Sequence, residues 1–297
     1  NSGRKKTMLV TAAAIENSAP EGMILIAFED ITDTEETREY LQAKNEELRS
    51  YSSQLESFTI AASHNLLDPV RKIYMFGKKI IDSEASITES GKNQLQRLLN
   101  TAANLNKLME DLINYSKINF AEKKFKKTDL NLLLKKALHD LKNVIKEKNA
   151  VITADDLLPM SIIPQQMLLL FTHLVENSLK YAKKDSVPEI KISMYIVDND
   201  ELEGYNYDAD CDYIKLSVSD IGIGFGKDFE TLIFDPFYKL QSDEQHYSTG
   251  LGLTLVQKIV SNHRGFIKAS STMGEGTSIF IYLPFEVSFA GRCYSPN

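Results

Sequence analysis

Two short hydrophobic runs open the chain, separated by a polar stretch. Residues 7–15 (TMLVTAAAI) and 23–29 (MILIAFE) have the length and composition of β-strands, and ENSAPEG between them is rich in turn-forming residues. The pattern predicts a β-hairpin. Because an isolated hairpin is only marginally stable, we expect this one to be the tail end of a domain whose front lies outside the sequence.

The hydrophobic period lengthens after residue 30. A long polar segment follows, whose helical N-terminus Thr32, Asp33 or Thr34 is expected to cap. Apolar residues recur in it every three or four positions, which is typical of a coiled-coil seam and predicts one long helix. Pro69 is expected to kink this helix, because proline cannot donate a backbone hydrogen bond. The seam residues are Leu48, Tyr51, Leu55, Phe58, Ala62, Leu66, Val70, Ile73 and Ile80.

A histidine, His64, lies on the other side of this helix. At ~100° per residue, Leu66, Val70 and Ile73 fall ~180–240° away from it, whereas Asp68 shares its face. The geometry therefore predicts that His64 faces solvent. On geometry alone, an ordinary surface histidine explains the position better than a functional one.

Residues 90–118 form a second helical segment with its own apolar stripe. The two segments predict a helical hairpin whose apolar face is only half covered, so that dimerisation into a four-helix bundle would complete the core. Residues 119–127 (NFAEKKFKK) are expected to be a basic linker. The stripe consists of Leu95, Leu98, Ala102, Leu105, Met109 and Leu112.

From residue 128 onward, helical and strand-like runs alternate. Helices are expected at DLNLLLKKALHDLKNVIKEK, PQQMLLLFTHLVENSLKYAKK and STGLGLTLVQKIVSNH, and strands at AVITADD, EIKISMYIVD, YIKLSVSD, GFIKASST and TSIFIYLPF. A polar insert, NDELEGYNYDADCD, follows the second of these strands. The mixture predicts an α+β multidomain protein whose C-terminal part is a two-layer α/β sandwich.

Composition narrows the function classes. A chain of 297 residues is expected to form two or three units, and its net charge of −7 disfavours nucleic-acid binding. Cys211 and Cys293 lack the spacing of a zinc site or disulfide framework, which fits a reducing, cytoplasmic location. No apolar run in this chain approaches the ~20 residues of a membrane span, although a membrane segment upstream would be compatible with it.

Two glycine-rich motifs follow predicted elements of the C-terminal part. In SDIGIGFG, residues 219–226, Gly222 and Gly224 let the backbone approach a ligand, and Asp220 can accept a hydrogen bond from an exocyclic amine. Alone, this motif is a weak signal that also describes a turn. STGLGL, residues 248–253, opens a helix, whose free N–H groups suit a phosphate; alone, it describes a glycine-rich helix cap equally well.

The segment HLVENSLKYAKK places four polar residues on one helix: His173, Glu176, Asn177 and Lys180. His173 and Asn177 are four residues apart and share a face. The carbonyl oxygen of Asn177 can bind Mg²⁺, a hard cation, and Lys180, one turn on, can reach a phosphate. Each residue alone is compatible with a solvated helix face, but the two glycine motifs favour a nucleotide site.

Taken together, these motifs resemble those of two-component sensor histidine kinases. HLVENSLKY resembles the N box, DIGIGF the first glycine box, FDPFYKL the F box, STGLGL the second glycine box and MGEGT the last one. SHNLLDPVRKI resembles the H box, and FEDIT the exit of a PAS sensor domain. The C-terminal part resembles the Bergerat-type ATPase domain shared with gyrase, Hsp90-type chaperones and MutL.

The resemblance implies a role for each matching position. His64 would be the phosphoacceptor that attacks the γ-phosphoryl group of ATP, Asn177 would hold Mg²⁺, and Asp220 would bind the adenine amine. Residues 225–248 would form a lid over ATP, anchored by Phe234 and Phe237. The other nucleotide-binding residues implied are Lys180, Tyr181, Gly222, Gly224, Lys239, Thr249, Gly250, Leu251, Gly252 and Thr277.

Four positions depart from the family pattern. Asn65 stands where relatives carry an acidic residue thought to act as the base on the histidine, so we hypothesise slow autophosphorylation, with Asp68 helping. Asp68 also stands where relatives with phosphatase activity carry Thr or Asn. His173 replaces the usual Asn, and Ser248 replaces a glycine.

The favoured function is thus an ATP-dependent protein-histidine kinase that forms a homodimer and passes phosphate to the receiver domain of a separate response regulator. The alternative is an ATP-binding pseudokinase acting as a dimeric interaction module; a chaperone-type ATPase is disfavoured by the helical hairpin. A coiled coil would carry the signal from the PAS-like remnant.

The implied domains are a remnant hairpin (1–33), a signalling helix (34–60), a dimerisation and phosphotransfer hairpin (61–120), a linker (121–127), an ATP-binding domain (128–286) and a tail (287–297).

Overall fold

The computed structural model describes residues 6–15, 23–83, 87–120, 124–197, 199–202, 207, 211–240 and 249–285. The chain divides into two compact units, residues 1–58 and 59–297. The predicted turn at 16–22, the tail at 287–297 and Cys293 lie outside the described residues. The described part contains no helix that is both long and apolar enough to cross a membrane.

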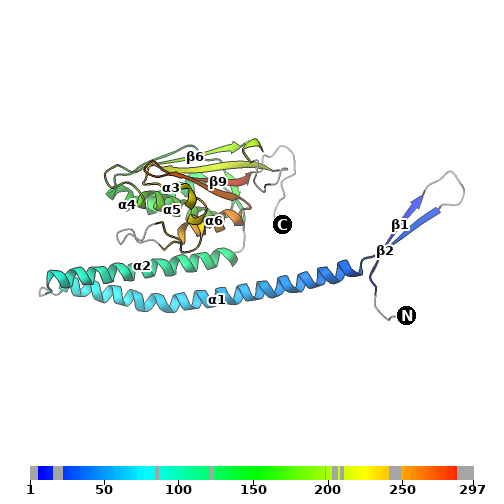
Figure 1. Ribbon diagram of the computed structural model, residues 1–297, viewed down its shortest axis with the longest axis horizontal. Coiled ribbons are helices and arrows are strands. Elements are labelled where there is room, and N and C mark those ends of the chain that lie inside the picture. Colours follow the sequence, from blue (N-terminus) through cyan, green and yellow to red (C-terminus); the bar gives the residue numbers. More distant parts are fainter. Residues whose placement is uncertain are drawn as a thin grey trace. The chain divides into compact units, whose positions relative to one another are not determined.

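The first unit begins with the predicted β-hairpin, which is confirmed. Strands β1 (Met8–Ile15) and β2 (Met23–Asp30) pair antiparallel, with Met8 opposite Asp30 (Figure 1). Apolar side chains on both strands remain exposed, including Val10 at 54% and Phe28 at 66%. Such exposure is expected of a hairpin that packs against no further layer among the described residues.

Helix α1 (Thr32–Ser83) starts directly after this hairpin, and its N-terminus corrects the predicted cap. Oδ1 of Asp30 accepts hydrogen bonds from the backbone N–H of Thr32 at 3.2 Å and from its hydroxyl at 2.6 Å. The cap is therefore the carboxylate that ends β2, rather than Thr32, Asp33 or Thr34. Hydrogen bonds from Lys6 and Thr32 lower the pKa of Asp30 to about 2, so this carboxylate is ionised at neutral pH.

In the second unit, the end of α1 pairs with helix α2 (Glu89–Phe120) in a helical hairpin. The α1 helix continues through Pro69, and Leu67 packs with Met109 and Ile113. The helices approach closely at Gly77, where a Cβ atom would lie 2.6 Å from Cδ2 of Leu99.

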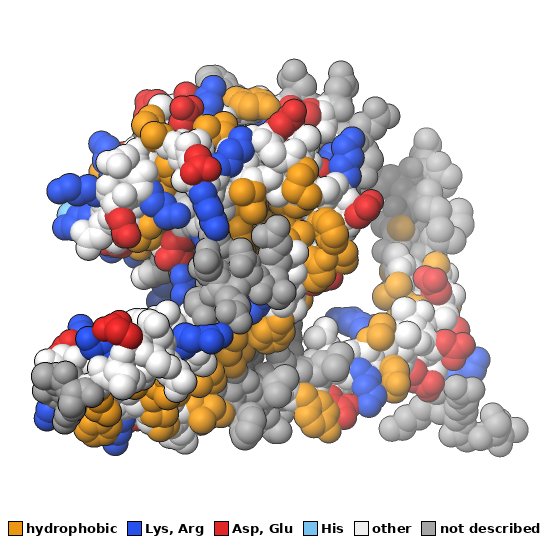
Figure 2. Space-filling view, turned by 60° about the vertical axis from the view of Figure 1, so that its left-hand side comes forward, with side chains coloured by type: hydrophobic (Ala, Val, Ile, Leu, Met, Phe, Trp, Pro, Cys, Tyr) orange, Lys and Arg blue, Asp and Glu red, His pale blue; other side chains and the backbone are white. Residues whose placement is uncertain are grey.

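The predicted seam faces in two directions. Val70, Leu99 and Ala102 are buried within the hairpin. Other seam residues remain 39–49% exposed, so a stripe of apolar side chains lies on the open side of the hairpin, where Figure 2 shows hydrophobic groups gathered. We call it the open apolar stripe; it consists of Leu66, Ile73, Ile80, Leu98 and Leu105.

Residues 124–285, here called the α/β domain, are built on a five-stranded sheet of order β4-β6-β7-β9-β8. Only the pair β4–β6 is parallel. A two-stranded sheet, β3 (Lys126–Thr128) with β5 (Met160–Ile162), lies beside it. The five strands are β4 (Val151–Ala154), β6 (Glu189–Val197), β7 (Asp212–Asp220), β8 (Phe266–Thr272) and β9 (Gly276–Phe285).

Helices cover one face of this sheet (Figure 1), which confirms the α+β class. Side chains of α5 (Pro164–Lys180) such as Phe171 and Leu170 pack on sheet residues such as Ile214, and all three are fully buried. The expected helix over residues 129–148 is interrupted at Leu141. The helices are α3 (Leu130–Asp140), α4 (Lys142–Glu147), α5 (Pro164–Lys180) and α6 (Gly252–Asn262), with short 3₁₀ turns at Asn199–Leu202, Lys227–Phe229 and Leu232–Phe234.

The polar insert after β6 packs on the other face of the sheet. Its Leu202 is fully buried, and Glu201 forms an ion pair with Lys215 of β7. The ammonium group of Lys215 also lies over the ring of Phe280, 4.5 Å from its centroid. The insert and these aromatic contacts thus shield part of the outer face from water.

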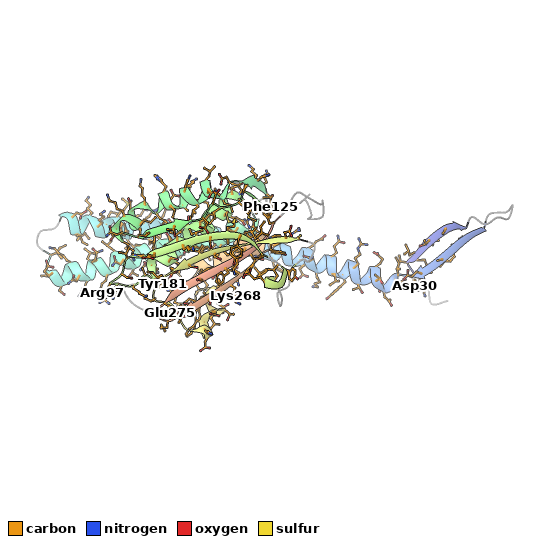
Figure 3. All side chains as sticks on the ribbon, turned by 90° about the horizontal axis from the view of Figure 1, so that it is seen from above. Asp30, Arg97, Phe125, Tyr181, Lys268 and Glu275 are labelled. Atoms are coloured by element: carbon orange, nitrogen blue, oxygen red, sulfur yellow. The ribbon has the colours of Figure 1, made fainter. Side chains whose placement is uncertain are left out.

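His263 joins three segments of the α/β domain. Its Nε2 accepts the backbone N–H of Ile163 at 3.0 Å, its Nδ1 donates to the carbonyl of Ile259 at 2.8 Å, and its ring contacts Phe125, labelled in Figure 3.

Replacing His263 by alanine should lower the free energy of unfolding by about 1–3 kcal/mol, because the buried N–H of Ile163 loses its acceptor. Urea denaturation followed by circular dichroism measures this change. The exposed His139, replaced by alanine, serves as the control and should cost less than about 0.5 kcal/mol. Equal effects of the two substitutions would contradict the structural role of His263.

Candidate functional site

Asp220, the last residue of β7, ties three segments together. Its Oδ1 accepts the N–H groups of Gly222 at 2.9 Å and Thr277 at 3.3 Å, and its Oδ2 accepts the hydroxyl of Ser178 at 3.0 Å. Burial raises the pKa of Asp220, while the three hydrogen bonds lower it. The carboxylate is thus a fixed acceptor with its orientation set by α5, β7 and β9.

The turn after Asp220 passes so close to two other segments that no side chain fits at its glycines. A Cβ atom on Gly224, whose φ is +60°, would lie 2.0 Å from the carbonyl oxygen of Thr272. The N–H of Ile223 donates to the carbonyl of Tyr181 at 2.9 Å, and its own carbonyl accepts the N–H of Gly274 at 2.7 Å. Figure 3 shows Tyr181 and Glu275 at this same end of the domain.

Gly222 is restricted in the same way, because its Cβ atom would lie 2.5 Å from the carbonyl of Tyr181. Both glycines predicted from the motif are therefore required by close backbone approach.

Asn177 and His173 of α5 both face the first residue of α6. A Cβ atom on Gly252 would lie 3.4 Å from Nδ1 of His173 and 3.9 Å from Nδ2 of Asn177. Burial lowers the pKa of His173, so the imidazole is neutral at pH 7. His173 is only 6% exposed, and its Nε2 has no hydrogen-bond partner within the described residues.

The segment before α6 forms a tight turn. Gly250 has φ of +73°, and its Cβ atom would lie 2.7 Å from the carbonyl carbon of Phe237. Thr249 Oγ1 accepts the N–H of Leu251 at 3.3 Å, and α6 starts at Gly252, four residues later than the motif predicts. The amides of this turn lie at the positive end of the α6 helix dipole, which favours an anion.

Lysine side chains surround the same region. Burial and, to a smaller extent, the positive charges of Lys107 and Lys239 lower the pKa of Lys180 from 10.5 to about 8. Its ammonium group lies 5.5 Å from the centroid of the Tyr181 ring. Glu176, which pairs with Lys107 at 3.0 Å, is the carboxylate nearby, and a bound phosphate chain would add negative charge beside Lys180 and Lys239.

The predicted lid anchors behave differently. Phe234 is buried, 4% exposed, as expected of an anchor. The side chain of Phe237 is 57% exposed, so its predicted anchoring role is corrected: only its backbone is held, by an N–H that donates to the carbonyl of Gly250 at 2.9 Å. Its φ of +65° places Phe237 in the left-handed region, which is uncommon for a residue other than glycine. Lid residues 241–248, including Ser248, lie outside the described residues.

The structure places the histidine motif on α1, with Asn65 and Asp68 exposed. The side chain of His64 lies outside the described residues, so its exposure stays a prediction. None of the contacts above joins Asn65 or Asp68 to the cluster around Asn177 and Asp220. Ser178 contributes to the site without having been predicted, because its partner lies 42 residues further along the chain.

Comparison with known proteins identifies the class of the α/β domain. Residues 163–287 match the family of histidine kinase-, DNA gyrase B- and HSP90-like ATPases. Cyanobacterial phytochrome B from Nostoc sp. is 31% identical over 243 residues, which are 80% of this chain and 30% of the phytochrome. Sensor protein kinase WalK from Staphylococcus haemolyticus is 26% identical over 268 residues, 87% of this chain and 39% of that kinase.

Solved structures agree on the fold. Full-length ShkA in complex with AMPPNP has a TM-score of 0.56 at 18% identity, covering 78% of this chain and 46% of ShkA. Histidine kinase ThkA in complex with the response regulator TrrA has a TM-score of 0.52 at 18% identity, covering 93% of this chain and 75% of that one.

The predicted resemblance to a two-component sensor histidine kinase is thus confirmed, whereas the PAS remnant stays a prediction. The chain spans about a third of the length of the curated relatives it matches.

Proposed function

We propose that this chain is an ATP-dependent protein-histidine kinase that phosphorylates His64 and passes the phosphoryl group to an aspartate of a response regulator. The convergence of Asp220, Asn177 and the turn at Gly250 carries this proposal, because it joins an acceptor, a metal ligand and an anion site in one domain. The test is incubation with ATP labelled in the γ-phosphate: an acid-labile, base-stable label on His64 supports the kinase.

Each part of the ATP molecule has a proposed partner. Oδ2 of Asp220 accepts the adenine amine, while Gly222, Gly224 and Thr277 shape the turn around the base. Phosphates are held by the amides of Gly250, Leu251 and Gly252 and by the ammonium groups of Lys180 and Lys239. Tyr181 lines the adenine side through its position beside Gly222.

Mg²⁺ fits the donor set as a metal that arrives with the nucleotide. The described residues contain no group of three or more His, Cys, Asp or Glu side chains that would hold a metal alone. A single protein oxygen, that of Asn177, is compatible with Mg²⁺, which keeps phosphates and waters as its other ligands. When bound, the ion neutralises charge on the phosphates.

Transfer requires an unprotonated ring nitrogen on His64. That nitrogen attacks the γ-phosphorus, a P–N bond forms, and the bond to the bridging oxygen breaks to release ADP. The proton of the imidazole must go to a base. Asn65 cannot accept a proton, so Asp68, one turn further on the same helical face, is the proposed acceptor.

The proposed homodimer follows from the open apolar stripe. Its leucines and isoleucines repeat every seven residues on both helices, as at Leu66 and Ile73 or Leu98 and Leu105. Packing this stripe against a second copy would form a four-helix bundle and remove the exposed apolar surface from water. The domain boundaries given by the sequence remain part of this proposal.

Asn65 favours the second candidate, a pseudokinase that binds ATP and signals through its conformation. Binding of ATP without a label on His64 would support it. The kinase is preferred because the candidate phosphoacceptor, His64, accompanies the residues proposed to hold the adenine, the metal and the phosphates.

Replacing Asn65 by aspartate should raise the initial rate of autophosphorylation at least about tenfold, because the carboxylate adds a base beside the imidazole. Single-turnover labelling with ATP measures the rate. Replacing Asp68 by asparagine is the matched variant and should slow labelling. An unchanged rate in Asn65→Asp would contradict the idea that Asn65 limits the reaction.

Binding of ATP should weaken as the pH rises from 7 to 9. The ammonium group of Lys180, with a pKa of about 8, loses its proton in this range and with it the attraction to phosphate, which reduces affinity by up to about tenfold. The unfolded chain binds this proton up to a pKa of 10.5, so the same group makes the free energy of unfolding rise with pH between about 8 and 10.5. Isothermal titration calorimetry measures the affinity. In Lys180→Arg, which stays charged, the pH dependence should be lost.

A further inference from the structure

A polar contact joins helix α2 to the turn before α6. The hydroxyl of Thr249 donates to Oδ2 of Asp111 at 2.6 Å, and the two residues are only 9% and 4% exposed. One turn earlier on the same face of α2, Nζ of Lys107 forms an ion pair with Oε2 of Glu176 of α5 at 3.0 Å. A groove of about 500 Å³ between the hairpin and α5 is lined by all of these residues except Thr249.

The same hydroxyl also accepts a hydrogen bond from a backbone amide of the turn that is proposed to bind phosphate. Oγ1 of Thr249 accepts the N–H of Leu251 at 3.3 Å. A hydroxyl has one hydrogen to donate, and because Asp111 receives it, a lone pair is directed to Leu251. The amide proposed to hold phosphate is therefore already bonded, and a carboxylate lies directly behind the hydroxyl that bonds it.

We infer that Asp111 is a positioning residue that opposes nucleotide binding from the helical hairpin, by holding Thr249 on the amide of Leu251. The inference rests on the proposed function, in which that amide binds phosphate. For a phosphate to take the amide, the hydroxyl of Thr249 must turn away from it, and the negative charge of Asp111 repels the incoming phosphate.

The register of the helical hairpin places the contact between Asp111 and Thr249 near His64, the proposed phosphoacceptor. Leu67 packs against Met109 and Ile113, which flank Asp111. His64 lies three residues before Leu67 on the antiparallel helix, and thus near the level of Asp111 along the hairpin. The contact between Asp111 and Thr249 consequently lies near the level of the proposed phosphoacceptor, and nucleotide has to loosen this contact in order to bind.

Titration calorimetry of the full chain with ATP and Mg²⁺ tests the inference. Asp111→Ala should bind about tenfold more tightly than the unchanged chain, since one hydrogen bond to a charged group no longer competes. Asp111→Asn keeps an acceptor without the charge and should fall between the two. Glu110→Gln, which removes a charge from the neighbouring exposed residue, is the matched control and should change affinity less than about twofold.

The pairing with Thr249 is tested by a double variant. Thr249→Val and Asp111→Ala remove the same contact, so the double variant should bind ATP less tightly than the sum of the two single gains predicts. Hydrogen exchange at the amide of Leu251 should become faster in Asp111→Ala without nucleotide. Unchanged or weaker binding in both Asp111 variants, or fully additive gains, would overturn the inference. Absence of ATP binding by the unchanged chain would instead refute the proposed function.

Discussion

Replacing His64 by glutamine is expected to lower labelling by ATP about a thousandfold or more, to background. Glutamine retains a polar side chain of similar length but offers no imidazole nitrogen to form the P–N bond. The affinity for ATP should change less than about twofold, because every residue proposed to contact nucleotide lies in the α/β domain. Labelling with γ-phosphate-labelled ATP, followed by acid and base treatment, measures the first effect, and calorimetry measures the second.

The chain provides a matched control for this substitution. His139 is exposed on α3, away from the residues around Asp220. His139→Gln should label like the unchanged chain. If His64→Gln kept a base-stable label, another histidine would be the acceptor, and the assignment of His64 would fail.

Replacing Asp220 by asparagine is expected to weaken ATP binding about a hundredfold. The substitution keeps the shape of the side chain but replaces one acceptor oxygen by an N–H₂ group. One of the donors that Asp220 accepts, which are the hydroxyl of Ser178, a backbone N–H or the adenine amine, then faces another donor. Binding of GTP should weaken less, because guanine presents an oxygen where adenine presents its amine.

Calorimetric titration with ATP and GTP in parallel measures this change in preference. Asp228→Asn, an exposed carboxylate on the neighbouring 3₁₀ turn, is the control for charge alone and should leave both affinities within about twofold. An equal loss for both nucleotides would indicate damage to the fold of the turn rather than loss of adenine recognition. In that case the role of Asp220 in recognising the base would be wrong.

The sequence predicts best where a constraint is local. Gly222 and Gly224 follow Asp220 within four residues, and the structure explains both by backbone approach within the same turn. The β-hairpin and strands β6 to β9 are predicted because each strand is seven or more residues long and rich in apolar residues. The four-residue β4 is predicted from AVITADD, whereas the three-residue strands β3 and β5 are too short to give a signal.

Contacts between distant segments are what the sequence does not reveal. Thr249 meets Asp111 across 138 positions, and no spacing rule connects a carboxylate on α2 with a hydroxyl before α6. The predicted cap of α1 is wrong for a related reason, because the carboxylate that caps the helix belongs to Asp30 at the end of β2. The exposure of the Phe237 ring, at 57%, is likewise not indicated by the motif that contains it.

The two edge strands of the five-stranded sheet are β4 and β8, and each has one side that pairs with no further strand of this sheet. On one side, β4 contributes only four residues, Val151–Ala154, so few N–H and C=O groups are available there to a foreign strand. On the other side, β8 carries the exposed Lys268 near its middle, and a charge in that position disfavours strand addition by another chain. Strand addition that would lead to fibrils is therefore disfavoured at both edge strands, and concentrated protein is expected to associate through its helices.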